Sequence, residues 1–140
     1  MDVMLNSDVL AEEILRFQGD WQQTYCEANG IANPPSEYGN EPSLSIIGNT
    51  FVVTHSDGSI SIKGLFTLDP MQEPKVIDWS DTFGTDAGKT FLAIYRFEAD
   101  RLIFCAADEG QARPKEFHAH EGQVLRVHQR VMSKVDTGNS

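Results

Sequence analysis

The sequence predicts an all-β fold: an eight-stranded antiparallel up-and-down barrel with a short N-terminal helix. Three observations carry this prediction. Apolar residues recur three and four apart before Gly19, whereas after it they alternate with polar residues, which is the period of strands. Short strand-like runs follow one another with hairpin turn signals between them, and no βαβ pattern interrupts them. Closing eight strands removes the sheet edges and leaves an interior that side chains or one small ligand can fill.

The composition restricts the classes of protein to which this chain can belong. A chain of 140 residues with 40% hydrophobic residues is long enough for one domain with its own core. Its formal net charge of −10 argues against binding to nucleic acid or to an anionic membrane surface, because both need clustered Lys and Arg. No run typical of a signal peptide or membrane span is present, so we expect a cytoplasmic protein in which Cys26 and Cys105 are reduced.

The N-terminal segment predicts one short helix, which Ser7 or Asp8 can cap and Gly19 can end. Its apolar stripe has helical spacing and consists of Leu10, Ile14 and Phe17. Such a stripe needs a surface to cover, and in a barrel protein that surface is an open end. We therefore assign residues 1–18 to a helix that caps the barrel and residues 19–132 to the barrel itself.

The strands are predicted from alternation and from the turn residues that separate them. They cover residues 20–27, 43–47, 50–55, 59–68, 74–79, 90–97, 101–107 and 123–132. Gly48-Asn49 is a typical two-residue hairpin turn, and a shift of the alternation at Gly64 predicts a bulge or barrel corner. Two longer loops, at 28–40 and 81–89, either carry function or cross a barrel mouth. The polar residues 133–140 predict a flexible tail.

The start of the first strand resembles a known superfamily. Gly19-Asp20-Trp21 is similar to the Gly-x-Trp of lipocalins and related calycins, in which the tryptophan closes one barrel end beneath a basic residue of the last strand. The resemblance implies that Trp21 packs beneath Arg126 or Arg130. Further segments resemble, in order and spacing, an uncharacterised lipocalin-like bacterial domain family common in planctomycete-type proteomes; they are residues 17–21, 74–78, 88–95, 100–105 and 113–117. This resemblance implies a lipocalin-like barrel and no particular activity.

The candidate ligand-binding residues are three aromatic residues and one arginine. Tyr25, Trp79 and Tyr95 are candidates to line a pocket, and each can equally belong to the plain core. Arg113 precedes a proline that marks a rim or an entry. Its guanidinium can present a fork to an anionic ligand at the barrel mouth, or it can neutralise a carboxylate such as Asp78.

No catalytic or metal site is predicted. His118 and His120 lie two apart in a short extended segment with Glu116 on the same face, but this set is more typical of solvent-exposed histidines than of a metal site. The apolar neighbours of Cys105 keep its thiol unreactive. The acidic residues beside the second loop lack calcium-loop spacing, and Gly-Lys-Thr at 88–90 lacks the spacing of a phosphate loop. We therefore expect no enzyme activity, no cofactor and no metal.

The leading functional hypothesis is a non-catalytic binding module whose barrel holds a small amphipathic molecule or presents its loops to a protein partner. The net charge of −10 and the acidic loops also allow an acidic inhibitor or immunity-type protein that neutralises a basic toxin or enzyme. A third hypothesis is an enzyme working inside the barrel, which would need a carboxylate or histidine with a perturbed pKa in a cavity. A pocket, if the barrel has one, is expected at the end opposite Trp21.

Overall fold

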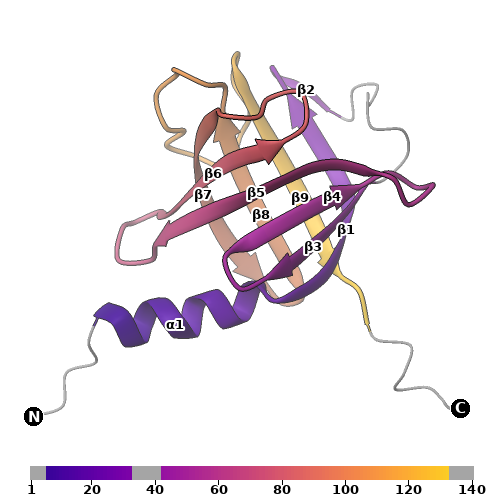
Figure 1. The fold of residues 1–140 in the computed structure, drawn as a ribbon. Helices are drawn as coiled ribbons and strands as arrows, with labels where there is room; N and C mark the ends of the chain where they lie inside the picture. Colours follow the sequence, from indigo (N-terminus) through magenta and orange to yellow (C-terminus); the bar gives the residue numbers. More distant parts are fainter. Residues whose placement is uncertain (1–5, 33–41, 133–140) are drawn as a thin grey trace, which may run out of the picture.

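The barrel expected from the sequence is present in the computed structural model, which describes residues 6–32 and 42–132. Its elements are α1 (Asn6–Phe17), β1 (Gly19–Ala28), β2 (Ile31–Ala32), β3 (Ser43–Ile47), β4 (Thr50–Thr54), β5 (Ile60–Asp69), β6 (Lys75–Phe83), β7 (Thr90–Glu98), β8 (Arg101–Ala107) and β9 (Gln123–Arg130). Each strand from β3 to β9 pairs antiparallel with the next, and β1 pairs with both β3 and β9 (Figure 1). These eight strands close into a barrel, and β2 adds a short pairing beside β1.

The all-β prediction, with eight barrel strands and an N-terminal helix, is therefore confirmed. Most strand bounds lie within two residues of their predicted positions, because turn residues mark both ends. The predicted tail at 133–140 and most of the predicted loop at 28–40 lie outside the described residues.

Strand β6 is the exception, since it continues to Phe83 instead of ending at Trp79. Its buried positions are Ile77, Trp79 and Asp81, so the alternation continues through a carboxylate that faces the interior. A strand is predicted from apolar residues at every second position, and a charged residue at one of these positions breaks the pattern. The short extended segment predicted around His118 is not a strand and belongs to the irregular connection between β8 and β9.

Two irregularities decide which side chains face the interior. In β1 the register with β9 shifts between Gln23 and Tyr25, so Tyr25 pairs with Val127 and turns to the outer face. Unbroken alternation predicts Tyr25 on the same side as Trp21, and the bulge overturns that prediction. In β5 the register shifts at Gly64, where the sequence predicts it, and a Cβ at this position would overlap the backbone of β6.

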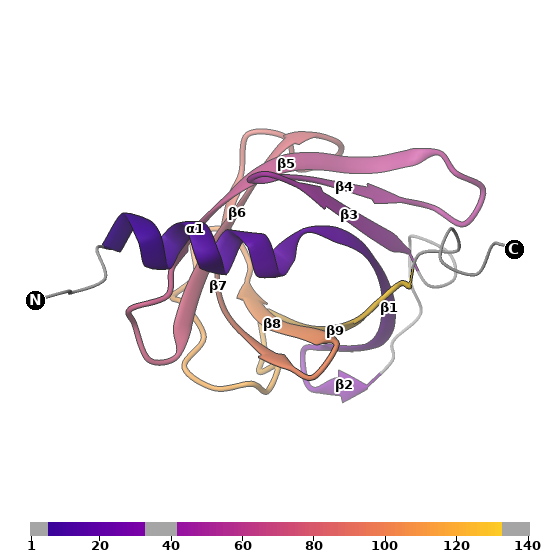
Figure 2. The same ribbon diagram turned by 90° about the horizontal axis from the view of Figure 1, so that it is seen from below.

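Helix α1 lies across one end of the barrel, as Figure 2 shows from below. Its last residue, Phe17, points into the barrel. The Phe17 ring centroid lies 5.0–5.3 Å from the ring centroids of Phe66, Tyr95 and Phe97. Trp21 is fully buried next to Phe17, and its indole Nε1 donates a 2.9 Å hydrogen bond to the Phe17 carbonyl oxygen. This end of the barrel is closed by packed aromatic rings.

Arg130 is the basic residue that lies over Trp21. Its guanidinium carbon is 4.2 Å from the indole centroid, and its nitrogens donate 2.7 Å hydrogen bonds to the carbonyl oxygens of Gln18 and Arg16. These contacts attach the end of α1 to β9. Arg126, the other arginine that the sequence offers for this place, makes its contacts inside the barrel instead.

The core has two parts, one on each side of the sheet. The larger part lies inside the barrel and includes Trp21 and Trp79. The smaller part lies on the outer face beneath the β8–β9 connection, and its buried members are Ile94, Ile103, Cys105, Ala119 and Leu125. In the portion of the chain that the structure describes, no helix has the length and apolar character needed to cross a membrane.

Candidate functional site

The end of the barrel opposite α1 contains a cavity of about 230 Å³. All eight barrel strands contribute residues to its lining, and Asp86 of the β6–β7 loop lies beside them. Its apolar lining includes Leu44, Phe51, Trp79, Phe91, Phe104 and Val124. The barrel is thus filled next to the helix and hollow at the other end, so this mouth is the candidate place for a ligand inside it.

Aromatic rings in mutual contact form one wall of the cavity. Trp79 on β6 lies 5.1 Å from Phe51 on β4 and 4.9 Å from Phe104 on β8, measured between ring centroids. Phe104 in turn stacks on the imidazole of His128 on β9, with the centroids 5.6 Å apart and the planes 12° from parallel. Strands β8 and β9 are adjacent, whereas β5 lies between β4 and β6 and β7 lies between β6 and β8. The four rings therefore meet because their side chains reach toward one another inside the barrel.

Polar side chains of β1 and β9 form a second part of the lining. The Arg126 guanidinium donates to Gln23 Oε1 at 2.9 Å and to Cys26 Sγ at 3.8 Å. His128 is only 4% exposed, and burial together with the nearby Arg126 charge lowers its pKa to about 3. The imidazole is therefore neutral at pH 7, and the positive charge of this part of the cavity is that of Arg126.

Two buried nitrogen atoms of the lining lack a hydrogen-bond partner within residues 6–32 and 42–132. They are Nε1 of Trp79 and Nδ1 of His128, both from side chains that line the cavity. Buried polar groups are normally hydrogen-bonded, because leaving them unpaired costs free energy. A water molecule or a polar ligand group in the cavity would supply such a partner.

Three aspartates surround the mouth of the cavity, namely Asp81, Asp86 and Asp108. Asp81 is only 7% exposed, and burial, followed by the charge of Asp86, raises its pKa to about 6. Backbone bonds hold the β6–β7 loop against Asp81: its amide donates to the Lys89 carbonyl at 3.0 Å, and the Gly88 amide donates to its carbonyl at 2.8 Å. The fold thus keeps a carboxylate inside the barrel next to a second one.

Of the four predicted ligand-binding residues, only Trp79 lines the cavity. Tyr25 is on the outer face because of the β1 bulge. Tyr95 lies at the closed end, where its hydroxyl donates a 2.7 Å hydrogen bond to Glu13 Oε2. Arg113 bonds Asp78 Oδ1 at 2.6 Å on the outside of β6, which is the structural alternative that the sequence also allowed. Tyr25, Tyr95 and Arg113 are therefore not part of the candidate site.

Among the polar residues of the cavity, only Arg126 was predicted as a site residue, and it was predicted for the closed end beside Trp21. Gln23 and Arg126 lie at interior positions of predicted strands, where polar residues are unusual. His128 follows Arg126 by two positions, and Asp81 follows Trp79 by two, so both share the interior phase of their strands. The sequence signal for this site is therefore a polar residue at a strand position whose alternation places it inside the barrel.

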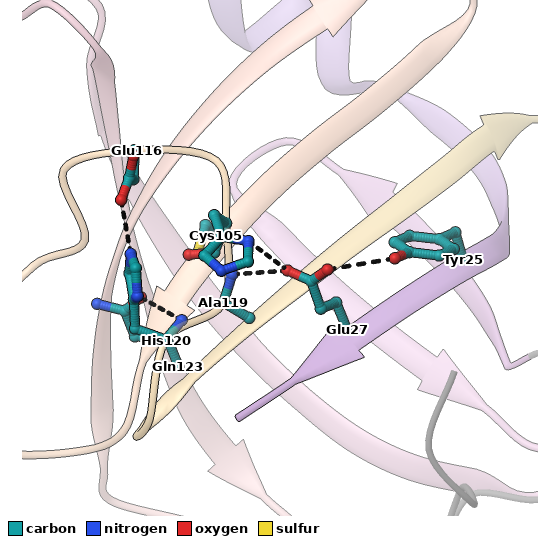
Figure 3. A network of polar contacts seen from close by, with 8 residues as sticks. Tyr25, Glu27, Cys105, Glu116, Ala119, His120 and Gln123 are labelled. Carbon is teal, nitrogen blue, oxygen red and sulfur yellow. Dashed lines mark hydrogen bonds and ion pairs between the residues drawn. The ribbon is translucent and has the colours of Figure 1, made fainter. Parts of the chain in front are cut away.

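A second polar network lies on the outer face, in the β8–β9 connection (Figure 3). Glu27 of β1 accepts hydrogen bonds from the Ala119 amide at 2.8 Å and the Tyr25 hydroxyl at 3.3 Å, and it lies 3.2 Å from His118 Nδ1. His120 Nε2 is 2.6 Å from Glu116 Oε2. The Glu27 contacts hold the connection against β1, and the contact between Glu116 and His120 lies within the connection.

The outer network has a structural role in this arrangement. Cys105 donates to the His118 carbonyl at 3.6 Å, and burial raises the pKa of its thiol to about 11, so the thiol stays protonated at pH 7. Searching the described part of the chain finds no group of three or more His, Cys, Asp or Glu side chains placed to hold a metal ion. The network anchors a loop over the outer hydrophobic cluster.

Comparison with known proteins finds no matching family model, curated protein or solved structure. The resemblance to a lipocalin-like family therefore stays a prediction that rests on the sequence motifs.

Proposed function

We propose that this protein is a non-catalytic cytoplasmic binding module that takes a small amphipathic ligand into the open end of its barrel. The observation that carries the proposal is the cavity of about 230 Å³, with an aromatic wall and a polar region facing one interior. An apolar cavity of roughly 150 Å³ is enough to bind benzene. Sites for drug-sized ligands begin at about 300 Å³. The ligand expected here therefore has the size of one or two rings.

The lining suits a ligand with two chemically different ends. Its apolar body would pack against Trp79 and Phe104, where contact with rings replaces contact with water. Its polar end would face Arg126 and His128 on β9. The closed end of the barrel is packed with aromatic rings, so the open mouth is the expected route of entry.

A fluorescence titration with the neutral two-ring dye 1-aminonaphthalene tests the proposal. The dye is expected to bind saturably, and Ala106→Leu, which fills the cavity from β8, is expected to weaken binding at least about tenfold. Ala87→Leu, the same change in the exposed β6–β7 loop, serves as the control and should bind like the unmodified protein. Absence of saturable binding, or equal binding by Ala106→Leu, would overturn the proposal.

Asp81 favours a second function, acid–base catalysis on a small molecule in the cavity. Its pKa of about 6 is close to the working pH that an effective general base needs. A direct test uses 5-nitrobenzisoxazole, from which a carboxylate removes one ring proton while the N–O bond opens to a phenolate. Under this function the rate rises with pH through about 6, and Asp81→Asn abolishes it. Equal rates for both proteins would exclude a general-base role for Asp81.

The acidic-inhibitor hypothesis rests on the net charge of −10. Asp86 and Asp108 at the mouth would contribute to an acidic surface for a basic partner. No further geometry of the described residues favours it over a small-molecule site, so it stays a prediction. Binding that disappears between low and moderate salt would distinguish a charged protein partner from a ligand held in the cavity.

A further inference from the structure

The aromatic wall indicates the shape of the ligand's body. Phe51, Trp79, Phe104 and His128 contact one another in sequence across four strands, and all four line the cavity. Rings pack on rings in offset-stacked or edge-to-face arrangements, which stabilise the contact beyond the area that it buries. A planar ring therefore gains more from this wall than a flexible alkyl chain of the same area does.

The two unpaired nitrogens indicate what the ring must carry. The indole Nε1 of Trp79 is only a donor, so the group that pairs with it must be an acceptor. The neutral imidazole of His128 has one donor and one acceptor nitrogen, and it can pair with either kind of group. Both unpaired atoms are fully buried in the side chains of the wall. The proposed contact with a ligand atom therefore requires the indole ring of Trp79 to move toward the cavity.

The charges around the cavity argue against an anionic ligand. Arg126 is the cationic residue of the lining, and it already donates to Gln23 and Cys26. Three aspartates line the same cavity, so an anionic ligand would be repelled as it enters. His128 adds no positive charge, because burial and Arg126 keep it neutral.

Building on the proposed function, we propose that the ligand is a neutral, planar heteroaromatic molecule with a hydrogen-bond acceptor on its ring, which pairs with the indole Nε1 of Trp79. The ring stacks within the wall of Phe51, Phe104 and His128. The acceptor satisfies the buried donor that the described residues leave unpaired. A ring carbonyl or ring nitrogen supplies such an acceptor without a charge.

Three two-ring probes of similar size test this inference by calorimetry. Coumarin has a ring carbonyl acceptor and no donor, naphthalene has neither, and 2-naphthoate carries a negative charge. We expect coumarin to bind about tenfold more tightly than naphthalene, the ratio that one buried hydrogen bond supplies. The anion 2-naphthoate is expected to bind most weakly of the three.

Two matched variants locate the hydrogen bond. Trp79→Phe keeps a ring in the wall and removes the donor, so it should bind coumarin no more tightly than naphthalene. Trp21→Phe makes the same change at the closed end and should keep the preference for coumarin. Circular dichroism of both variants establishes that they are folded before their affinities are compared.

The possible failures are distinguishable. If none of the probes binds, both the small-ligand function and this inference are overturned. If naphthalene binds as tightly as coumarin and Ala106→Leu blocks both, the small-ligand function stands and the heteroaromatic inference is overturned. The inference also fails if Trp79→Phe keeps the preference for coumarin, or if 2-naphthoate binds most tightly.

Discussion

Glu13 shows how one side chain can attach a helix to a barrel. It lies on α1 and is 7% exposed. Its Oε2 accepts hydrogen bonds from the Tyr95 hydroxyl at 2.7 Å and from Lys75 Nζ at 3.1 Å. Burial raises the pKa of Glu13, but these hydrogen bonds and the charges of Lys75 and Arg16 outweigh burial, so its pKa is lowered. The ionised form therefore stabilises the closed end.

The first prediction concerns Glu13→Gln. Because the folded protein lowers the pKa of Glu13, its contribution to stability is present above the ordinary value of 4.5 and is lost as the pH falls below it. We expect Glu13→Gln to lower the free energy of unfolding by about 1–3 kcal/mol at pH 7, and by less at pH 3. Urea unfolding at both pH values measures this difference. Glu12→Gln, on the exposed side of α1, is the control.

The pKa of Asp81 is shifted in the opposite direction to that of Glu13. The folded protein raises its pKa from 3.8 to about 6, so the stability linked to its protonated form is complete below pH 3.8 and is lost as the pH rises to about 6. We expect Asp81→Asn to stabilise the barrel at pH 7 by about 1–3 kcal/mol and to leave it unchanged near pH 3.5. Urea unfolding between these pH values measures the change. Equal stability at every pH would show that Asp81 is well solvated.

Among the elements, the β8–β9 connection shows how an irregular segment is held in place. It places Ala119 in a fully buried position on the outer cluster, and the Ala119 amide donates to Glu27 on β1. Phe117 packs against the same cluster and lies under the Arg96 guanidinium, 4.4 Å from ring centroid to carbon. Side-chain contacts hold this segment in place, because its backbone does not pair with a strand of the sheet.

The prediction at this scale is that Glu27→Ala loosens the connection and leaves the cavity intact. The Ala119 amide loses its acceptor, so its hydrogen exchange should become at least about tenfold faster. Amides of the neighbouring strands should keep their protection, and dye binding should not change. Glu121→Ala, an exposed acidic residue of the same connection, is the control. Unchanged protection of Ala119 would mean that the outer apolar contacts alone hold the loop.

The elements also show what the sequence could and could not predict. Hairpins such as Gly48-Asn49 are local signals, and the strands that they join were placed within two residues. The β1 bulge has no local signal, because Thr24 interrupts the register only where β1 pairs with β9, about a hundred residues later. That is why Tyr25 was assigned to the wrong face. Asp81 was placed in a loop because a buried carboxylate does not look like a strand residue.

At the scale of the whole molecule, the barrel divides into a packed half and a hollow half. The packed half contains Phe17, Trp21 and the helix, whereas the hollow half contains the cavity with Trp79 and His128 on its wall. The same eight strands pass through both halves. Stability and binding can therefore be changed separately, because different residues of the same strands carry them.

Trp21→Ala tests this division. Removing a fully buried indole is expected to lower the free energy of unfolding by about 3–5 kcal/mol and the melting temperature with it. At a temperature where the variant is folded, dye affinity at the open mouth should stay within about twofold of the unmodified protein, since less than 0.5 kcal/mol is expected from distant sites. The exposed Ile47→Ala is the control. An unchanged melting temperature would contradict the assignment of Trp21 to the barrel end.

The chain contains two tryptophans, and the fold places one at each end of the barrel. Trp21 is enclosed beneath Arg130, and Trp79 borders the cavity. The protein therefore has two intrinsic fluorophores in different environments. Fluorescence of Trp21 is expected to report on the folding of the closed end, and fluorescence of Trp79 on the binding of a ligand at the mouth. In the two single-tryptophan variants, unfolding and occupancy could be recorded as separate signals, without any attached label.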